Sequence, residues 1–370
     1  RVCPEAADAA YKVMTEVYGN PGSTHKLGRE ARAVLDDSRK KLAAALGCAP
    51  KEVYFTSGGT ESDNWAILEG AYLQRRVGRH IISSAVEHDA VRKPLEKLAR
   101  EGYEVTLLSP DSTGAISVDA VRAALREDTA LVTLMMVNNE TGAVTDIAGV
   151  ARALRAAKSR ALLHTDAVQG FMKEPFSAKT LGADMISVSG HKIHAPKGIG
   201  ALYLSDRLVQ AFRPPYLGGE QERGLRPGTE NLPYAMGLAA AATRLAKTMK
   251  SRDTAMKALN QRLRDGLKAF PEVELNSPEN AVPEVLNFSE MCIKSETMLA
   301  WLAEAQVYVS SASACGRGQP SHTLAAMGRD PLAIDTAIRV SFCAGNTPED
   351  VDAFLNRFED GMKHLQKIRK

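Results

Sequence analysis

The sequence has few aromatic residues, no long apolar run and no strong excess of either charge. Phe, Trp and Tyr make up 5% of the 370 residues, so aliphatic side chains must supply most of the apolar area in the core. The 47 Lys and Arg residues nearly balance the 44 Asp and Glu residues and leave a net charge of +3. No basic cluster indicates nucleic-acid binding. No apolar stretch approaches the roughly 20 residues that a membrane helix needs, so we expect no membrane partner.

Cysteine is also scarce, and its spacing argues against two kinds of site. The five cysteines form no CxxC pair and show no spacing that is typical of metal ligands. An odd count in a chain of this length favours a reducing compartment over a disulfide framework. Since no signal-peptide pattern is present either, we expect a cytoplasmic protein without a metal site. The chain begins with Arg1 instead of Met, and we expect further residues upstream of it.

Helical patterns alternate with short β-branched runs through the first part of the chain. Several of the predicted strands are apolar without alternation, which is typical of strands buried on both faces of a parallel sheet. We therefore expect the α/β class, with a parallel sheet covered by helices. The predicted strands are residues 53–55, 80–85, 103–108, 130–137, 161–164, 184–188 and 200–204.

The pattern changes after a long helix that we predict at residues 233–270. A polar loop with several glycines, residues 218–228, precedes this helix, and mixed strands and helices follow it. The sequence thus predicts a large domain, residues 1–248, and a smaller α+β domain, residues 249–370.

A lysine and an aspartate each follow a predicted strand, at the strand ends that border the ligand crevice of α/β sheets. Ser189-Gly190-His191-Lys192 would present an amine to a cleft lined by hydroxyl and imidazole groups; an ordinary surface lysine is the alternative. Asp166 can pair with the protonated pyridine nitrogen of a cofactor, and Gln169 lies within reach of the same ring. The alternative for Asp166 is a helix N-cap.

Two further segments suit a planar, phosphorylated cofactor. Ser57-Gly58-Gly59-Thr60 joins a strand to a helix, where glycines and a helix N-terminus favour an anion, although a plain glycine turn is the alternative. Glu87-His88 ends another strand, and the imidazole of His88 can stack on a flat ring. A structural histidine is the alternative there.

Taken together, these segments resemble the cysteine desulfurases of the group I type, in the class V aminotransferase family of fold-type-I enzymes that use pyridoxal 5'-phosphate (PLP). The resemblance runs in order along almost the whole chain. It implies a mainly parallel sheet of seven strands covered by helices, a homodimer, and PLP as the cofactor. The matching segments are GNPGSTH (19–25), TSGGTESDN (56–64), EH (87–88), NNETG (138–142), HTDAVQ (164–169), SVSGHKIHAPKGIG (187–200), RPGTEN (226–231), SSASAC (310–315) and IRVS (338–341).

The resemblance implies a role for each cofactor-binding candidate. Lys192 would bind the cofactor covalently and act as acid and base. Asp166 would hold the pyridinium nitrogen, and Gln169 would hold the ring hydroxyl. His88 would stack on the ring and belongs to the expected catalytic set with Lys192 and Cys315. The residues expected to bind the phosphate are Gly59, Thr60, Ser189, His191 and, across the dimer, Thr229.

Cys315 decides which reaction the resemblance implies. Its neighbours are small and polar, with glycines on one side, as in mobile functional loops. The resemblance implies that Asn139 and Arg339 bind the carboxylate of L-cysteine, which the planar fork of arginine suits. Cys315 would then receive the sulfur as a persulfide, and L-alanine would leave. Cys48, Cys292 and Cys343 fit a buried, structural role better.

Two alternatives remain open. Another class V PLP enzyme, such as a selenocysteine lyase or an aminotransferase, would share most of these residues, but an aminotransferase would make a keto acid instead of alanine. A non-catalytic scaffold in a sulfur relay would need none of Lys192, Asp166 and Gln169. The sulfur acceptor also stays open, and an iron–sulfur scaffold or a tRNA-thiolation factor is the expected kind of partner.

Overall fold

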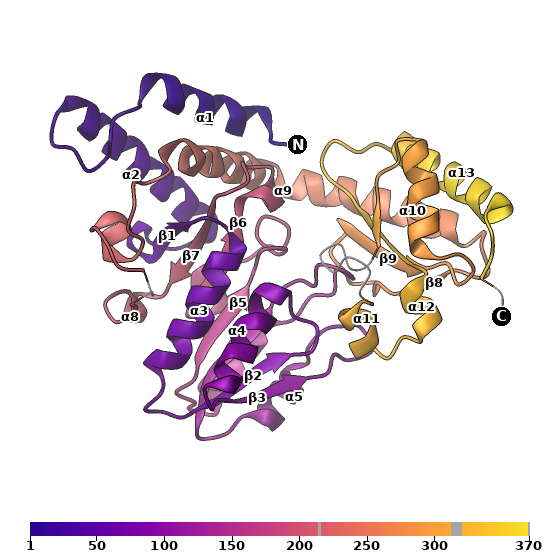
Figure 1. Cartoon of the computed structure of the whole chain (residues 1–370), viewed down its shortest axis with the longest axis horizontal. Helices are drawn as coiled ribbons and strands as arrows, with labels where there is room; N and C mark the ends of the chain where they lie inside the picture. Colours follow the sequence, from indigo (N-terminus) through magenta and orange to yellow (C-terminus); the bar gives the residue numbers. More distant parts are fainter. Residues whose placement is uncertain (214–215, 312–319, 369–370) are drawn as a thin grey trace. The chain divides into compact units, whose positions relative to one another are not determined.

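The structure, a computed structural model, describes residues 1–213, 216–311 and 320–368. The chain divides into two units (Figure 1). The large domain expected at residues 1–248 includes two segments, residues 109–117 and 137–145, that belong to the second unit of the structure. The first unit comprises Arg1–Leu108, Val118–Met136 and Asp146–Met249, and the second comprises Ser109–Ser117, Val137–Thr145 and Lys250–Lys370.

The first unit contains a seven-stranded sheet with the order β1-β7-β6-β5-β4-β2-β3. The strands from β6 to β3 in this order are parallel, while β7 runs antiparallel to both β6 and β1. Every residue of the inner strands is buried, which explains their apolar sequences without alternation. The expected α/β fold with a mainly parallel sheet is confirmed. The strands are β1 (Val53–Thr56), β2 (His80–Ser84), β3 (Glu104–Leu108), β4 (Thr129–Met135), β5 (Leu162–Asp166), β6 (Met185–Ser189) and β7 (Gly200–Leu204).

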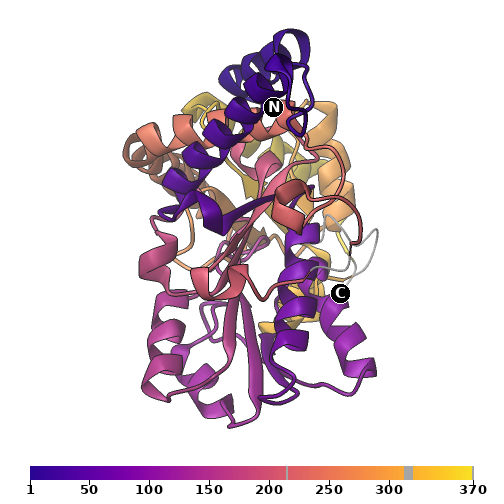
Figure 2. The same cartoon turned by 90° about the vertical axis from the view of Figure 1, so that its left-hand side faces the viewer.

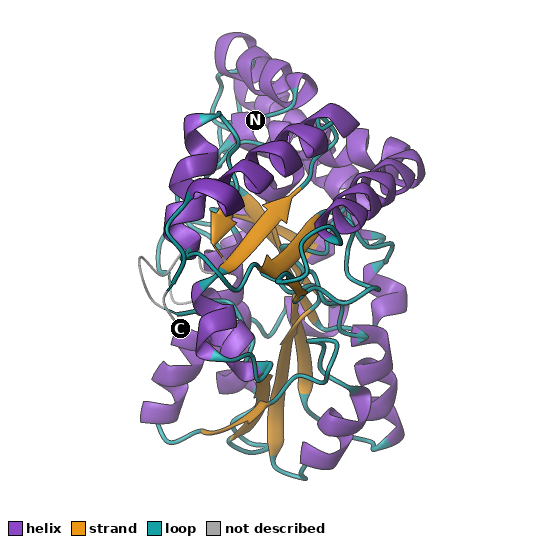
Figure 3. Ribbon diagram, turned by 90° about the vertical axis from the view of Figure 1, so that its right-hand side faces the viewer, coloured by secondary structure: helices purple, strands orange, loops and turns teal. Residues whose placement is uncertain are grey.

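Helices cover this sheet (Figure 2), and Figure 3 distinguishes the helices, strands and loops by colour. Two of them, α3 and α4, pack side by side, and Trp65, Ile67 and Leu98 contribute to one apolar cluster with residues of the strands. α2 ends where Gly47 adopts a φ of 69°, a left-handed conformation that favours the glycine expected as its C-cap. The helices are α1 (Pro4–Glu16), α2 (Lys26–Leu46), α3 (Gly59–Leu73), α4 (Asp89–Arg100), α5 (Val118–Ala124), α6 (Ile147–Ala156), α7 (Ala178–Leu181) and α8 (Asp206–Val209).

The second unit contains an antiparallel sheet with the order β10-β11-β9-β8. The rings of Phe288, Phe354 and Phe358 contact one another in its core, with centroids 5.6 to 6.3 Å apart. α9 (Leu232–Leu267) begins in the first unit and continues in the second. Among the described residues, no helix is long and apolar enough to cross a membrane. The other elements are β8 (Glu274–Leu275), β9 (Val285–Ser289), β10 (Ser310–Ser311), β11 (Ala337–Ser341), α10 (Ser295–Glu304), α11 (His322–Ala326), α12 (Pro331–Asp335) and α13 (Pro348–His364).

Candidate active site

Several candidate residues lie at one edge of the sheet in the first unit. β2, β5 and β6 belong to its parallel part, so their carboxyl ends share one edge. Asp166 is the last residue of β5, and Ser189 is the last residue of β6. His88 follows β2 after a short turn. The sheet therefore brings these three residues to the edge at which α/β proteins bind ligands.

Asp166 is nearly enclosed at this edge, with 6% of its surface exposed. Its Oδ1 accepts a hydrogen bond of 2.8 Å from the backbone N–H of Val168. Burial raises the pKa of Asp166, whereas the nearby charges of His88 and Lys192 lower it. The carboxyl group therefore ionises most readily when a cation faces it.

Lys192 lies on a short 3₁₀ turn, Gly190–Ile193, which follows β6 directly. The residue is half-buried. Burial and then the charge of Lys192 lower the pKa of the neighbouring His191. Because the same ammonium group also acts on Asp166, the expected lysine and the expected aspartate occupy one electrostatic environment.

The N-terminus of α3 lies beside the end of β6. A Cβ atom on Gly59, the first residue of α3, would lie 2.6 Å from Cγ2 of Val168. A Cβ atom on Gly200, which pairs with Ser189, would lie 2.6 Å from Cα of Gly58. Only glycine permits such a close approach. The backbone N–H groups in the first turn of α3 are thus brought to the sheet edge, where they can bind an anion.

Three polar side chains border this helix end. Ser189 is buried, and its Oγ forms a hydrogen bond of 2.9 Å with Nδ1 of His191. His191 is exposed, and so is Thr60 at the second position of α3. The expected phosphate-binding residues of the sheet and of α3 therefore lie together in the first unit.

His88 is the N-cap residue of α4. Its Nδ1 accepts a hydrogen bond of 3.1 Å from the backbone N–H of Ala90. Since Nδ1 is an acceptor, the proton of the neutral imidazole lies on Nε2. The cap fixes the direction of the half-buried ring relative to the helix.

Gln169 and Thr229 are the remaining cofactor-binding candidates. Gln169 is half-buried, three residues beyond Asp166, and its Oε1 accepts a hydrogen bond of 2.6 Å from Nζ of Lys173. Thr229 is exposed in the loop between the 3₁₀ turn Gln221–Gly224 and α9. Its expected role toward a partner subunit stays a prediction.

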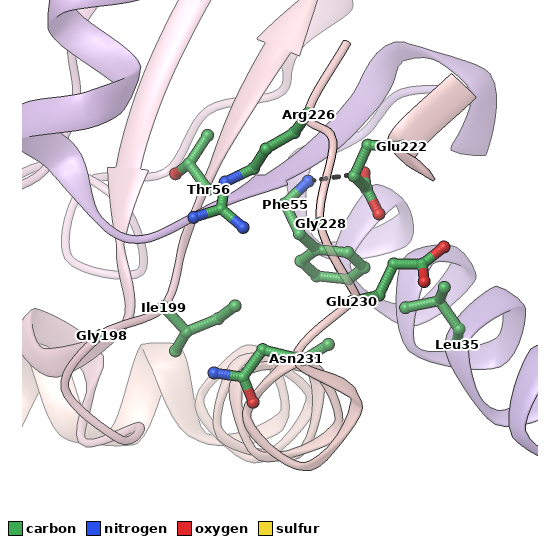
Figure 4. Close-up of a pocket in the computed structure, with 11 residues that line it drawn as sticks. Leu35, Phe55, Thr56, Gly198, Ile199, Glu222, Arg226, Gly228, Glu230 and Asn231 are labelled. Carbon is green, nitrogen blue, oxygen red and sulfur yellow. Dashed lines mark hydrogen bonds between the residues drawn. The ribbon is translucent and has the colours of Figure 1, made fainter. Parts of the chain in front are cut away.

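The loop that carries Thr229 is joined to α3 by an ion pair. Nε of Arg226 donates a hydrogen bond of 2.8 Å to Oε1 of Glu61, in the first turn of α3. Within the loop, the N–H of Gly228 donates to Oε1 of Gln221 at 3.1 Å. The loop also lines a cavity of about 50 Å³ beside β1 and α2 (Figure 4). Its start is therefore held against α3, the helix whose N-terminus is the candidate anion site.

In the second unit, the two expected substrate-binding residues are in contact. Nη1 of Arg339, on β11, donates a hydrogen bond of 2.9 Å to the backbone oxygen of Asn139. Nη2 of the same guanidinium donates to Oγ of Ser310 at 2.8 Å. Ser310 pairs with Arg339 across β10 and β11, so the arginine also adjoins the start of the predicted cysteine loop. Cys315 itself lies outside the described residues, and its role stays a prediction.

Comparison with known proteins identifies the family. The aminotransferase class-V family model matches residues 1–354. The chain belongs to the class V aminotransferase family. Putative cysteine desulfurase IscS 1 of Bacillus subtilis (strain 168) is 41% identical to it over 353 residues, which cover 94% of this chain and 92% of that protein. The expected resemblance to the cysteine desulfurases is thereby confirmed.

Two solved structures extend the comparison to three dimensions. A NifS-like protein is 35% identical, with a TM-score of 0.93, over 99% of this chain and 97% of that chain. A structure described as SspA in complex with cysteine is 30% identical, with a TM-score of 0.81, over 92% of this chain and 95% of that chain. Class V aminotransferases are PLP enzymes, and the family likeness thus agrees with the chemistry of the sheet edge.

Sequence reasoning missed a buried polar network beneath the sheet edge. Nδ1 of His164 bonds Oγ1 of Thr133 at 2.8 Å, and its Nε2 bonds Oγ of Ser187 at 3.0 Å. Oδ1 of Asp63, on α3, lies 3.6 Å from the same Nε2. Burial lowers the pKa of His164 to about 3 and raises that of Asp63 well above its usual range. A signal was available for His164 alone, as an ionisable residue inside an otherwise apolar strand segment.

Proposed function

We propose that the chain is a PLP-dependent cysteine desulfurase, a sulfurtransferase that converts L-cysteine to L-alanine and carries the sulfur as a persulfide on Cys315. One observation carries the proposal. In the first unit, an amine, a buried carboxyl group and a glycine-opened helix N-terminus meet at the carboxyl edge of one sheet, and the family of the chain consists of PLP enzymes.

The residues at this edge fit PLP at both of its ends. Gly59 leaves the space that a side chain would fill, so the N–H groups of α3 can approach a phosphate. Asp166 is a buried acid whose ionised form is favoured by a facing cation, which suits a protonated pyridine nitrogen. When bound, PLP supplies an electron sink that stabilises negative charge at the α-carbon of an amino acid.

The phosphate end is served by neutral donors and helix N–H groups. Burial keeps the pKa of His191 low, so at neutral pH its ring acts as a hydrogen-bonding group paired with Ser189. Thr60 adds a hydroxyl in the first turn of α3. Thr229 of a second copy would complete the phosphate site, which makes a homodimer part of the proposal.

Lys192 binds the cofactor and transfers protons. Its amine, on the turn after β6, takes the proton from the α-carbon of the substrate and later returns a proton to the alanine moiety. His88 stacks on the ring, with its orientation set by the bond from Ala90. Gln169 bonds the ring hydroxyl.

Arg339 and Asn139 bind the carboxylate of the substrate. The guanidinium of Arg339 is oriented by the backbone oxygen of Asn139 and by Ser310. A guanidinium held in this way presents a planar fork that matches a carboxylate. Arg339 and Asn139 thus select for an α-amino acid, and Cys315 reacts separately with the sulfur of the substrate.

Cys315 takes the sulfur. Its thiolate attacks the sulfur of the substrate, so that a new S–S bond forms while the bond between that sulfur and Cβ breaks. The electron pair of the broken bond stays on the carbon side, which gains a proton and leaves as L-alanine. The persulfide then passes to an acceptor protein, for which an iron–sulfur scaffold and a tRNA-thiolation factor are the candidates.

The experiment is an assay of the purified protein, loaded with PLP, for alanine and sulfide from L-cysteine in the presence of a thiol reductant. We expect both products in equal amounts, and we expect Lys192→Ala to abolish them and Cys315→Ala to stop turnover. Cys343→Ala, at a cysteine with no proposed role, serves as the matched control. A keto acid in place of alanine, unaffected by Cys315→Ala, would identify an aminotransferase instead. Release of selenide from selenocysteine but no sulfide from cysteine would identify a selenocysteine lyase.

A further inference from the structure

Glu87 joins the ends of two strands beneath the candidate site. Its Oε1 accepts a hydrogen bond of 2.6 Å from Oγ of Ser84, the last residue of β2. The same oxygen accepts a hydrogen bond of 3.0 Å from the backbone N–H of Met135, the last residue of β4. In the sheet register Met135 is the partner of Asp166. The side chain of Glu87 thus links the ends of β2 and β4, next to the end of β5 that carries the carboxyl group of Asp166.

Glu87 is also the residue directly before His88. The turn between them and β2 is short: the N–H of Val86 lies 3.4 Å from Oγ of Ser84, which itself donates to Glu87. His88 in turn begins α4 as its N-cap. The contact from Glu87 to β4 therefore holds the segment that aims the imidazole of His88.

The environment of Glu87 favours its neutral form. The side chain is completely buried, and burial raises its pKa to about 8, with a further contribution from the charge of Asp166. The bonds from Ser84 and Met135 act in the opposite direction. Asp63 of α3 is a second buried acid, and its pKa is also raised by burial.

Titratable side chains of α3 and β5 act electrostatically near Glu87. The charge of Asp166 on β5 raises the pKa of Glu87, and the charges of Asp166 and Glu87 contribute to the raised pKa of Asp63 on α3. His164 on β5 is held neutral by burial. Positive charge on Lys192, and on His88 when its ring is protonated, lowers the pKa of Asp166. Positive charge at the sheet edge thus favours the ionised form of Asp166.

We propose that Glu87 is a positioning residue for the cofactor: its side chain fastens the His88 segment to the end of β4, next to the strand end that carries Asp166. This inference rests on the proposed function, because it concerns the orientation of PLP. Glu87 touches neither the cofactor nor the substrate in this account, and it acts through His88 and through the ends of β4 and β5.

The test compares Glu87→Gln with Glu87→Ala in the PLP-loaded protein. The amide of glutamine can accept the same two hydrogen bonds and carries no charge, so Glu87→Gln reproduces the neutral acid. We expect it to keep the cofactor affinity and the visible circular dichroism of bound PLP at neutral pH. Glu87→Ala removes the acceptor for two buried donors, and we expect about tenfold weaker PLP binding and an altered dichroism band.

A pH titration of the cofactor absorbance gives a second readout. We expect the wild type to show a spectral change near pH 8, where Glu87 ionises, and Glu87→Gln to lack it. Glu290→Gln is the matched control, because Glu290 is another buried acid with a raised pKa, of about 7, but belongs to the second unit. It should leave the cofactor spectrum and its pH profile unchanged.

Two outcomes overturn the inference. One is that Glu87→Gln is as damaging to the dichroism as Glu87→Ala, which would mean that a charged carboxylate is required. The other is that Glu87→Ala changes neither affinity nor spectrum. If Glu87→Ala does not fold, Ser84→Ala removes one of the two bonds and must shift the dichroism in the same direction. A wild-type protein that binds no PLP would instead refute the proposed function.

Discussion

Three acids, Asp63, Glu87 and Asp166, are buried within range of one another's charge in the first unit. Burying several like charges is costly, and burial accordingly raises the pKa of each of these acids. Asp166 could be selected from the sequence because it follows a strand in the HTDAVQ segment. Asp63 could not, because an aspartate inside a helical pattern is ordinarily on the surface, and only tertiary packing shows that it is enclosed.

At the residue scale, Glu87 predicts how stability depends on pH. Its folded-state pKa of about 8 lies above the usual 4.5. Between these values the folded chain keeps a proton that the unfolded chain has lost, so the free energy of unfolding falls as pH rises. The slope from this group alone approaches about 1.4 kcal/mol per pH unit. Denaturant unfolding of the cofactor-free protein across this range should show a shallower decline for Glu87→Gln, and identical slopes would contradict the assignment.

The thiol of Cys48, a residue with no proposed role, also has a pKa that burial raises. Burial, followed by the charge of Glu52, raises its pKa to about 12. A thiol of this kind is a poor nucleophile at neutral pH. This agrees with the expected structural role of Cys48. It also means that labelling by a thiol reagent at neutral pH should leave Cys48 largely unmodified in the folded protein.

At the scale of elements, glycine positions decide how closely α3 approaches the sheet. The sequence predicted the strand, the turn and the helix, since a glycine pair between them is a recognisable pattern. It could not predict the 2.6 Å separation between a Cβ on Gly59 and Val168, because Val168 lies more than one hundred residues further along the chain. The close packing that brings the N-terminus of α3 to the sheet edge therefore arises only when distant parts of the chain fold together.

This packing predicts the effect of Gly59→Ala. Val168 is β-branched and stiff, so the added methyl group must displace the N-terminus of α3. We expect PLP affinity to fall by about tenfold, which corresponds to a loss of about 1.4 kcal/mol. Gly345→Ala is the control, because no atom lies within 4 Å of the added carbon and the residue is exposed. Equal PLP affinities of the two variants, measured by equilibrium dialysis, would show that the approach of α3 is unimportant.

A second contact between elements joins α2 to the loop ahead of Thr229. Nη1 and Nη2 of Arg39 each lie 2.6 Å from an oxygen of Glu222, and both side chains are less than a tenth exposed. Oε2 of Glu222 also accepts a hydrogen bond of 2.9 Å from the N–H of Phe55 on β1. The pair thus fixes the start of the loop to both α2 and β1.

Breaking this pair should be costly. Glu222→Gln leaves the guanidinium of Arg39 buried without its counter-ion, and we expect a loss of about 3–5 kcal/mol in the free energy of unfolding. The double variant Arg39→Met with Glu222→Gln buries no charge, so it should lose less than the single variant. Chemical denaturation of the three proteins measures both values. A double variant that is less stable than Glu222→Gln would refute this account of the pair.

At the scale of the whole molecule, most of the helices and strands lie close to their predicted positions because their hydrophobic patterns are long and regular. The membership of residues 137–145 in the second unit was not predictable in this way. It follows from tertiary contacts. Among them, Oγ of Ser277 donates to the backbone oxygen of Thr141 at 2.6 Å, and the N–H of Val282 donates to the backbone oxygen of Gly142 at 2.9 Å. These contacts place Asn139 in the same unit as Arg339, which the order of motifs along the chain does not reveal.

Mass spectrometry of the peptide that contains Cys315 follows the transferred sulfur atom itself. The PLP-loaded protein is mixed with one equivalent of L-cysteine in the absence of a reductant, and Lys192→Ala is treated in the same way. The account predicts one additional sulfur atom on Cys315 and one alanine released per sulfur in the wild type, and neither in Lys192→Ala. Alanine formation while Cys315 remains an unmodified thiol would contradict it.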